Sequence, residues 1–144
     1  MIRATLDTNA LASGAVAVAG PVAALIDAWR HRDLEVVVSP HIVTELERTL
    51  GKPYFARRLS PRMREEFLRL VRENTTIVTI TTPVPNVLRT RADNLVLATA
   101  ESAGVAYIVS GDRELQQLGR YQDIAILSPR DFLDLLMHEI VTSP

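Results

Sequence analysis

Residues 93–115 read DNLVLATAESAGVAYIVSGDREL, and the order of its parts determines the kind of fold we expect. The Ala-rich first half predicts a helix, and Gly104 follows it as the glycine that commonly closes a helix at its C-terminus. The continuous apolar run at 105–110 predicts a buried strand, and Asp112 stands just beyond its end. The segment LDTNAL, residues 6–11, repeats this order of strand and then acid near the N-terminus.

The rest of the chain continues the alternation of strands and helices. Continuous apolar strands are expected where helices cover both faces of a sheet. We therefore predict an α/β fold, a three-layer α/β/α sandwich around a mainly parallel sheet of about five strands. With 144 residues, the chain (1–144) is expected to form one domain. The predicted strands lie at 2–6, 34–39, 76–80, 105–110 and 124–127, and the predicted helices at 21–31, 40–50, 61–73, 93–103, 113–118 and 129–140.

The composition excludes several classes of site. The chain has no cysteine, which excludes disulfides, thiolate zinc sites and cysteine nucleophiles. Its three histidines are far apart, so a zinc enzyme is not expected. No apolar run reaches the roughly 18 residues of a membrane helix, and the apolar segment 10–26 contains glycine and proline, which makes it a poor match to a signal peptide. We therefore expect a cytoplasmic protein.

Arginines gather in two places, although the formal net charge is only -1 and no bulk positive field is expected. One interpretation is a genomic preference for arginine on solvated helix faces. The other is a local edge that binds phosphate, because guanidinium groups match phosphate oxygens well. The two groups are Arg57, Arg58, Arg62, Arg64, Arg69 and Arg72, and then Arg89 with Arg91.

Four acids are expected to meet at one edge of the sheet. In parallel α/β sheets, ligands bind beyond the carboxyl ends of the strands, and Asp7 and Asp112 follow such ends. Glu45 and Asp93 lie on helices whose starts face the same edge. Each acid also has an ordinary explanation: Asp93 and Asp112 as helix caps, Asp7 in an Asx turn and Glu45 as a surface residue.

Together the four carboxylates indicate a metal site, because no nearby lysine or arginine is an obvious partner for them. Two carboxylates about 5 Å apart repel by roughly 3 kcal/mol at an effective dielectric constant of about 20. Such a group either raises its pKa values or binds a cation. Oxygen ligands without histidine or cysteine favour Mg²⁺ or Mn²⁺, and the expected chemistry is phosphodiester hydrolysis by a metal-activated water.

Motifs of competing chemistries are missing from the sequence. It has no G-x-S-x-G nucleophile elbow, no phosphate loop and no G-x-G-x-x-G. A phosphatase of the haloacid dehalogenase type would need a second Asp where Asn9 stands. A receiver domain would need a well-placed lysine, and Lys52 is the only lysine.

Four segments together resemble a PIN domain, and most closely the toxin components of toxin–antitoxin systems. They are LDTNAL, SPHIVTELERTL with the following KPYF, the block from DNLV to SGDREL, and the closing ILSPRDFL. The resemblance extends over essentially the whole chain. It implies a ribonuclease that depends on Mg²⁺ or Mn²⁺ and whose catalytic, metal-binding acids fall on Asp7, Glu45, Asp93 and Asp112.

The resemblance also implies supporting residues. Thr8 and Asn9 would orient Asp7 or a metal-bound water, and Ser110 would supply a nearby hydroxyl. The third motif of the family often carries several acids, whereas TRADN carries a single one beside the neutral Asn94. This departure weakens the expectation of a second metal ion more than that of the first.

Glu114, four arginines and the expected binding partners complete the prediction. Glu114 either adds a carboxylate or lies on a solvated helix face, and we expect the solvated face. The implied partners are RNA, an antitoxin protein and a second copy in a dimer, without a membrane. The alternative is an RNA- or protein-binding PIN-like module that lacks catalysis. The arginines expected to contact the RNA backbone are Arg57, Arg58, Arg89 and Arg91.

Overall fold

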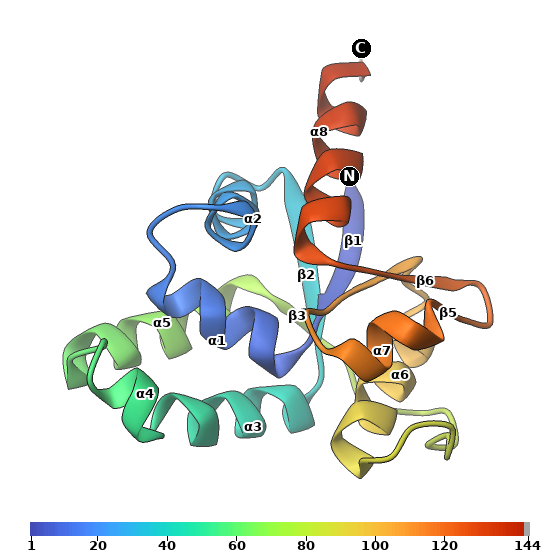
Figure 1. The fold of residues 1–144 in the computed structure, drawn as a ribbon, viewed down its shortest axis with the longest axis horizontal. Helices are drawn as coiled ribbons and strands as arrows, with labels where there is room; N and C mark the ends of the chain where they lie inside the picture. Colours follow the sequence, from blue (N-terminus) through green and yellow to red (C-terminus); the bar gives the residue numbers. More distant parts are fainter. Residues whose placement is uncertain (143–144) are drawn as a thin grey trace.

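The computed structural model describes residues 1–142, which form six strands and eight helices (Figure 1). The strands are β1 (Ile2–Leu6), β2 (Leu34–Val38), β3 (Thr76–Ile77), β4 (Tyr107–Val109), β5 (Arg120–Tyr121) and β6 (Ile124–Leu127). The helices are α1 (Thr8–Val16), α2 (Pro21–Arg30), α3 (Pro40–Leu50), α4 (Pro53–Ala56), α5 (Pro61–Asn74), α6 (Arg91–Ala103), α7 (Arg113–Leu118) and α8 (Pro129–Thr142).

The strands form one sheet in the order β3-β2-β1-β4-β6-β5. All pairs are parallel except the short edge pair of β5 with β6, which is antiparallel. Strand β1 lies between β2 and β4, with Ala4 opposite both Val36 and Tyr107. The carboxyl ends of the parallel strands therefore meet at a single edge of the sheet, which is the edge at which ligands bind in such folds.

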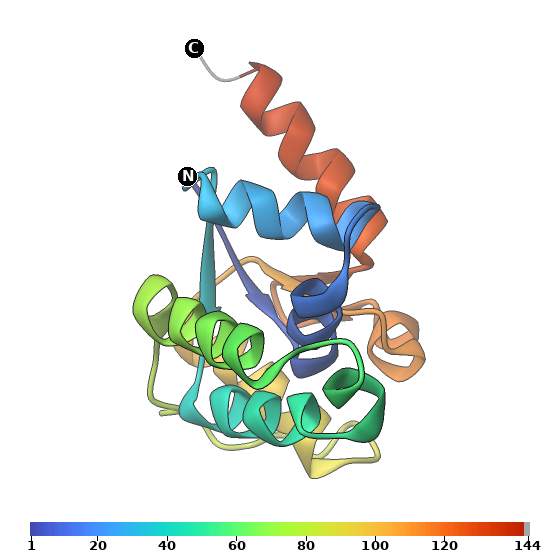
Figure 2. The same ribbon diagram turned by 90° about the vertical axis from the view of Figure 1, so that its left-hand side faces the viewer.

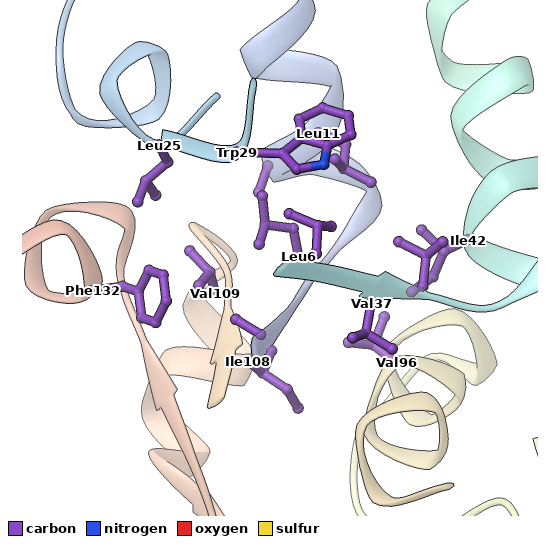
Figure 3. Packing of buried hydrophobic residues seen from close by; sticks show 14 of the residues in the cluster. Leu6, Leu11, Leu25, Trp29, Val37, Ile42, Val96, Ile108, Val109 and Phe132 are labelled. Atoms are coloured by element: carbon purple, nitrogen blue, oxygen red, sulfur yellow. The ribbon is translucent and has the colours of Figure 1, made fainter. Parts of the chain in front are cut away.

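Helices cover both faces of the sheet, as the predicted sandwich requires. Helices α1, α3 and α5 lie on one side of β1 and β2, and α6 lies on the other (Figures 1 and 2). In Figure 3, Leu6, Leu11 and Trp29 pack above the central strands, whereas Val37 points toward Val96 of α6. This alternation along the strands explains why they read as continuous apolar runs. The predicted fold class is confirmed, with one strand more than expected.

Three elements escaped the sequence prediction, and each has a local reason. Helix α1 consists mostly of small residues buried on several sides and shows no clear apolar stripe. In it, Gly14 lies so close to α2 that a Cβ would come within 2.6 Å of the Ile26 side chain. Helix α4 and strand β5 comprise only four and two residues, which is too short for hydrophobic periodicity to show.

The strand predicted at 76–80 is also much shorter in the structure. Only Thr76 and Ile77 pair with β2, followed by one further hydrogen bond from the Val78 amide to Val38. The amide of Thr81 then donates to the Ser102 hydroxyl at 2.9 Å, on α6, instead of to a strand. The chain leaves the sheet here and enters the proline-containing loop that leads to α6.

One predicted helix cap, Asp93, is not observed in the structure. Thr90, not Asp93, caps α6, because its hydroxyl accepts the Asp93 amide at 3.1 Å. Ser39 stands at the N-cap position of α3 but makes no capping bond; its buried hydroxyl accepts a hydrogen bond from Thr99 at 2.8 Å. Asp93 is therefore free of a capping role, while Gly104 ends α6 in the left-handed conformation, with a φ of 67°, as predicted.

Within residues 1–142, no single helix is long and apolar enough to cross a membrane. Only α1 and α2 taken together would meet the length and composition required, and they are bent by 91° relative to each other.

Candidate active site

Asp7 is the most deeply buried acid at the carboxyl edge of the sheet. It follows β1 directly and caps α1, where its Oδ1 accepts the Ala10 amide at 2.8 Å. Its Oδ2 accepts a hydrogen bond from the Ser110 hydroxyl at 2.5 Å. Only 4% of its surface is exposed. Instead of the Asx turn offered as its ordinary explanation, Asp7 forms a helix N-cap, and it also lies at the candidate site.

The electrostatics of Asp7 show that other acids lie nearby. Burial raises the pKa of Asp7 to about 6, although the hydrogen bonds from Ser110 and Ala10 work in the opposite direction. The carboxylates of Asp93 and Asp112 raise this pKa further. A buried carboxyl with a raised pKa and like-charged neighbours is characteristic of functional sites.

Asp93, Asp112 and Glu114 form a cluster in which the three nearest carboxylate oxygens lie within 4.8 Å of one another. Asp93 stands in the first turn of α6, and Asp112 caps α7 by accepting the Leu115 amide at 3.1 Å. Burial raises the pKa of Asp93, the Thr90 side chain lowers it, and the other two carboxylates raise it again. The three acids come from two helices that meet at the sheet edge.

Glu114 is half-buried within this cluster, so the expectation of a solvated helix face is wrong. One of its oxygens accepts the amide of Arg89 at 3.0 Å. This bond joins α7 to the loop before α6. The position of Glu114, two residues after Asp112, was a sequence signal for membership of the site. A charged residue in a short helix is equally typical of a solvent-exposed surface.

Glu45 approaches the site from α3 and shares a hollow with Asp7 and Asp93. The hollow has a volume of about 190 Å³. Glu45 is half-buried and forms an ion pair with Arg48 at 3.1 Å, one turn further along the helix. The expectation that the acids have no basic partner is therefore wrong for Glu45. The lining residues are Asp7, Thr8, Asn9, His41, Glu45, Thr49, Lys52, Ala92, Asp93 and Val96.

His41 is a lining residue that the sequence did not single out. It stands four residues before Glu45 and eight before Thr49, so these three side chains share one face of α3. Burial lowers the pKa of His41, with Arg91 and Arg48 acting in the same direction and Glu45 against it. These effects favour the neutral form of the imidazole. The spacing of four along α3 is the signal that could have identified it.

Ser110 holds two of the acids in place. It is fully buried, donates to Asp7, and accepts the amide of Asp112 at 2.9 Å. Thr8 and Asn9 line the hollow beside Asp7, as expected from their position.

Asn94 has a structural task instead of offering an oxygen to the site. Its side-chain oxygen accepts the amides of Val87 and Leu88, and its nitrogen donates to the carbonyls of Leu88 and Thr90. Because Asn94 is buried and all these bonds go to one loop, it fixes residues 87–90 against the start of α6. In this chain the third motif therefore has one acid, Asp93, followed by an asparagine side chain that holds the neighbouring loop in place.

The predicted arginines lie in two different settings. Arg89 and Arg91 line a hollow of about 320 Å³ with Asn86 and Asn94, beside the start of α6. Arg57 and Arg58 are exposed at the end of α4. Two other arginines of the group are engaged in surface ion pairs, Arg62 with Glu66 and Arg72 with Glu47.

Comparisons with known proteins agree on one fold. The sequence profile of the PIN domain matches residues 3–114, a range that contains all the acids described above. No curated protein matches the sequence. Three solved structures resemble this one. PAE2754 from Pyrobaculum aerophilum has a TM-score of 0.63 at 21% identity, covering 95% of this chain and 90% of that chain.

The other two structures come from bacterial systems. VapC20 of Mycobacterium tuberculosis, a Sarcin-Ricin loop cleaving toxin, has a TM-score of 0.58 at 14% identity, with 85% of this chain and 98% of that chain covered. VapBC2 of Rickettsia felis, bound to a DNA fragment from its promoter, has a TM-score of 0.58 at 9% identity, with 88% and 98% covered. At these identities the likeness shows a shared fold.

Proposed function

The chain belongs to the PIN-domain family, and on that premise we propose that it is a metal-dependent endoribonuclease. The observation that carries this proposal is the cluster of Asp93, Asp112 and Glu114 beside the buried Asp7. Within residues 1–142, none of these four carboxylates forms an ion pair with a lysine or arginine. Their mutual repulsion is a cost that a bound cation would remove.

The donor set fits Mg²⁺ or Mn²⁺, because it consists of carboxylate oxygens without cysteine or a histidine pair. Asp7, Asp93 and Asp112 would hold the ion directly or through water. A bound divalent ion lowers the pKa of a coordinated water and offsets the charge that develops on the phosphate oxygens. Glu114, which shares the cluster, would add a further oxygen to the same side.

The remaining residues of the hollow would orient the water and the substrate. Glu45, whose charge is partly balanced by Arg48, would complete the site or position the attacking water. Ser110 would keep the carboxylates of Asp7 and Asp112 in register. Thr8 and Asn9 would position Asp7 or a metal-bound water.

The RNA backbone would be held by arginines at both ends of the site. Arg89 and Arg91 line a hollow next to the start of α6 and would face phosphates there. Arg57 and Arg58 would contact the backbone on the opposite side, after α3. Such contacts make affinity fall with salt and give little sequence preference.

The biological setting that we infer is a toxin–antitoxin pair in the cytoplasm. VapC20 is a Sarcin-Ricin loop cleaving toxin, and VapBC2 was solved on promoter DNA. An antitoxin protein would then be the inhibitory partner of this chain, and a homodimer its working form. The alternative is a PIN-like module that binds RNA or protein without cleaving; the retained acids favour the enzyme.

The experiment that tests the proposal is RNA cleavage by the purified protein in a titration with Mg²⁺ and with Mn²⁺. Asp7→Asn serves as the inactive variant, and Asp134→Asn, an exposed acid on α8, as the matched control. We expect metal-dependent cleavage that is lost with Asp7→Asn and kept with Asp134→Asn. An equal cleavage rate in the Asp7 variant would contradict the assignment. RNA binding that is indifferent to metal, without cleavage, would favour the alternative.

A further inference from the structure

The segment from Gly51 to Arg64 is the most positively charged part of the chain. It contains five cationic side chains and no acid, in a protein whose net charge is -1. The segment follows α3 directly and includes α4, which continues from the end of α3 (Figure 1). A local positive surface beside an acidic site is the arrangement that brings a polyanion to it. The five residues are Lys52, Arg57, Arg58, Arg62 and Arg64.

The acidic hollow reaches this segment, because Lys52 is one of its lining residues. One face of α3 carries His41, Glu45 and Thr49 along the lining, and Lys52 extends it beyond the end of the helix. Lys52 lies seven positions after Glu45 in the chain, which corresponds to about 10 Å at the rise of an α-helix. At the ~3.4 Å spacing of stacked nucleotides, this distance corresponds to about three nucleotides.

An aromatic ring stands on the surface just beyond Lys52. Tyr54 is 51% exposed, a large value for an aromatic side chain in a folded protein. The guanidinium carbon of Arg58 lies 3.6 Å from the centre of its ring, and the same guanidinium donates to the Tyr54 carbonyl at 2.7 Å. The ring is therefore held in place on one side by a cation.

The base of this ring is rigid. Phe55 packs against the core and meets the Tyr54 ring edge to face, with ring centres 4.9 Å apart. Leu59 is buried, and its amide donates to the Phe55 carbonyl at 2.8 Å. Pro53 fixes the first position of α4. An exposed aromatic ring on a preformed support loses little entropy when a flat partner stacks on it.

We propose that Tyr54, held by Arg58, is a stacking site for an unpaired base of the RNA that enters the hollow past Lys52. Base stacking on aromatic rings is sequence-tolerant and works together with nearby arginines. A paired base cannot expose its face to the ring, so the site selects unpaired nucleotides a few positions from the cleaved bond. This inference rests on the proposed function, since it takes RNA as the ligand of the hollow.

The test is RNA binding in EDTA, where no cleavage is expected. Single-stranded oligonucleotides carry one 2-aminopurine at successive positions, and quenching of its fluorescence reports stacking. The proteins are wild type, Tyr54→Ala and Tyr54→Phe, the last of which keeps the ring and removes only the hydroxyl. Thermal melts of all three show that the exposed substitutions leave the fold intact.

We expect quenching at one or two adjacent positions in wild type and Tyr54→Phe, and its loss in Tyr54→Ala. The Kd for single strands should rise about ten-fold in Tyr54→Ala, with the salt slope unchanged, whereas Arg57→Ala should reduce that slope by about one. Duplex RNA should show no difference between the variants. Equal quenching and equal Kd in wild type and Tyr54→Ala would overturn the inference, as would an absence of RNA binding.

The same proteins separate this inference from the proposed function. If Tyr54-dependent stacking occurs but wild type cuts no RNA with Mg²⁺ or Mn²⁺, the stacking site stands and the nuclease fails. If wild type and Tyr54→Ala cut single strands with the same kcat/KM, the nuclease stands and the stacking site fails. A Tyr54→Ala protein that binds RNA normally but loses self-association in sedimentation would assign this face to a protein contact and also overturn the inference.

Discussion

Asp7→Asn should stabilise the fold at neutral pH even as it abolishes cleavage. The pKa of the Asp7 carboxyl is raised from 3.8 to about 6 in the folded protein. A group with a raised folded-state pKa contributes stability that is fully present below pH 3.8 and is lost as the pH rises through 6. A shift of this size corresponds to ~3 kcal/mol at pH 7. The neutral amide of asparagine does not pay this cost.

The hydrogen bonds reduce the gain. In Asp7→Asn the side-chain oxygen can still accept a hydrogen bond from the Ala10 amide. The side-chain nitrogen of the asparagine cannot accept the hydrogen of the Ser110 hydroxyl, as Oδ2 of Asp7 does. The Ser110 oxygen already accepts a hydrogen bond from the Asp112 amide. One disturbed buried hydrogen bond costs about 1 kcal/mol. We therefore expect the variant to be more stable than wild type by ~2 kcal/mol at pH 7.5.

The pH dependence is the sharper measurement, because the asparagine side chain of the variant does not titrate. At pH 5 the folded wild type is still mostly protonated at Asp7, whereas at pH 7.5 it is ionised. The difference in unfolding free energy between variant and wild type should therefore grow by ~1.4 kcal/mol from pH 5 to pH 7.5. Urea unfolding in EDTA measures it, with the single buried Trp29 as the fluorescent probe.

Groups far from Asp7 titrate equally in both proteins, so their contributions cancel in this comparison, whereas Asp93 and Asp112 interact with the Asp7 carboxylate and form part of the measured difference. Asp134→Asn, on the exposed side of α8, provides a control that should show no change with pH. A constant difference between Asp7→Asn and wild type at the two pH values would refute the raised pKa.

Two further substitutions probe the support of the site and of the core. Ser110→Ala removes the donor to Asp7 and the acceptor of the Asp112 amide. We expect urea unfolding to show a loss of about 1–3 kcal/mol of stability and RNA hydrolysis to show a lower cleavage rate. A variant as active as wild type would contradict the role of Ser110 in holding the two acids. Gly14→Ala places a methyl group 2.6 Å from the Ile26 side chain. We expect the free energy of unfolding to fall by about 1–3 kcal/mol because of overpacking between α1 and α2. An unchanged melting temperature would show that Ile26 can move aside without cost.

The elements that the sequence predicted well are those whose signals are local. Helix α6 and strand β4 follow from an Ala-rich run, a closing Gly104 in the left-handed conformation and a continuous apolar run. The acids Asp7 and Asp112 were placed at one edge because parallel strands end together. Such statements need only the order of elements along the chain.

The features that were missed depend on contacts between distant segments. Helix α1 is defined by its burial against α2 and α3, as the tight fit of Gly14 shows, and its composition alone has no helical stripe. Glu114 could not be distinguished from a surface glutamate, because only the fold brings it to the Arg89 amide and the cluster. The ion pair of Glu45 with Arg48 could have been predicted from the sequence, because residues three positions apart are neighbours on a helix surface.

The position of β1 has a consequence for how the protein is made. Asp7 leaves the ribosome well before its partner Ser110, which lies 103 positions later in the chain. Strand β1 also pairs with β4 on one side, so that side stays open until Val109 has been synthesised. A nascent or truncated chain that ends before this point has no assembled acidic site. The order of the strands thus delays any activity of that site until β4 and Ser110 have been synthesised.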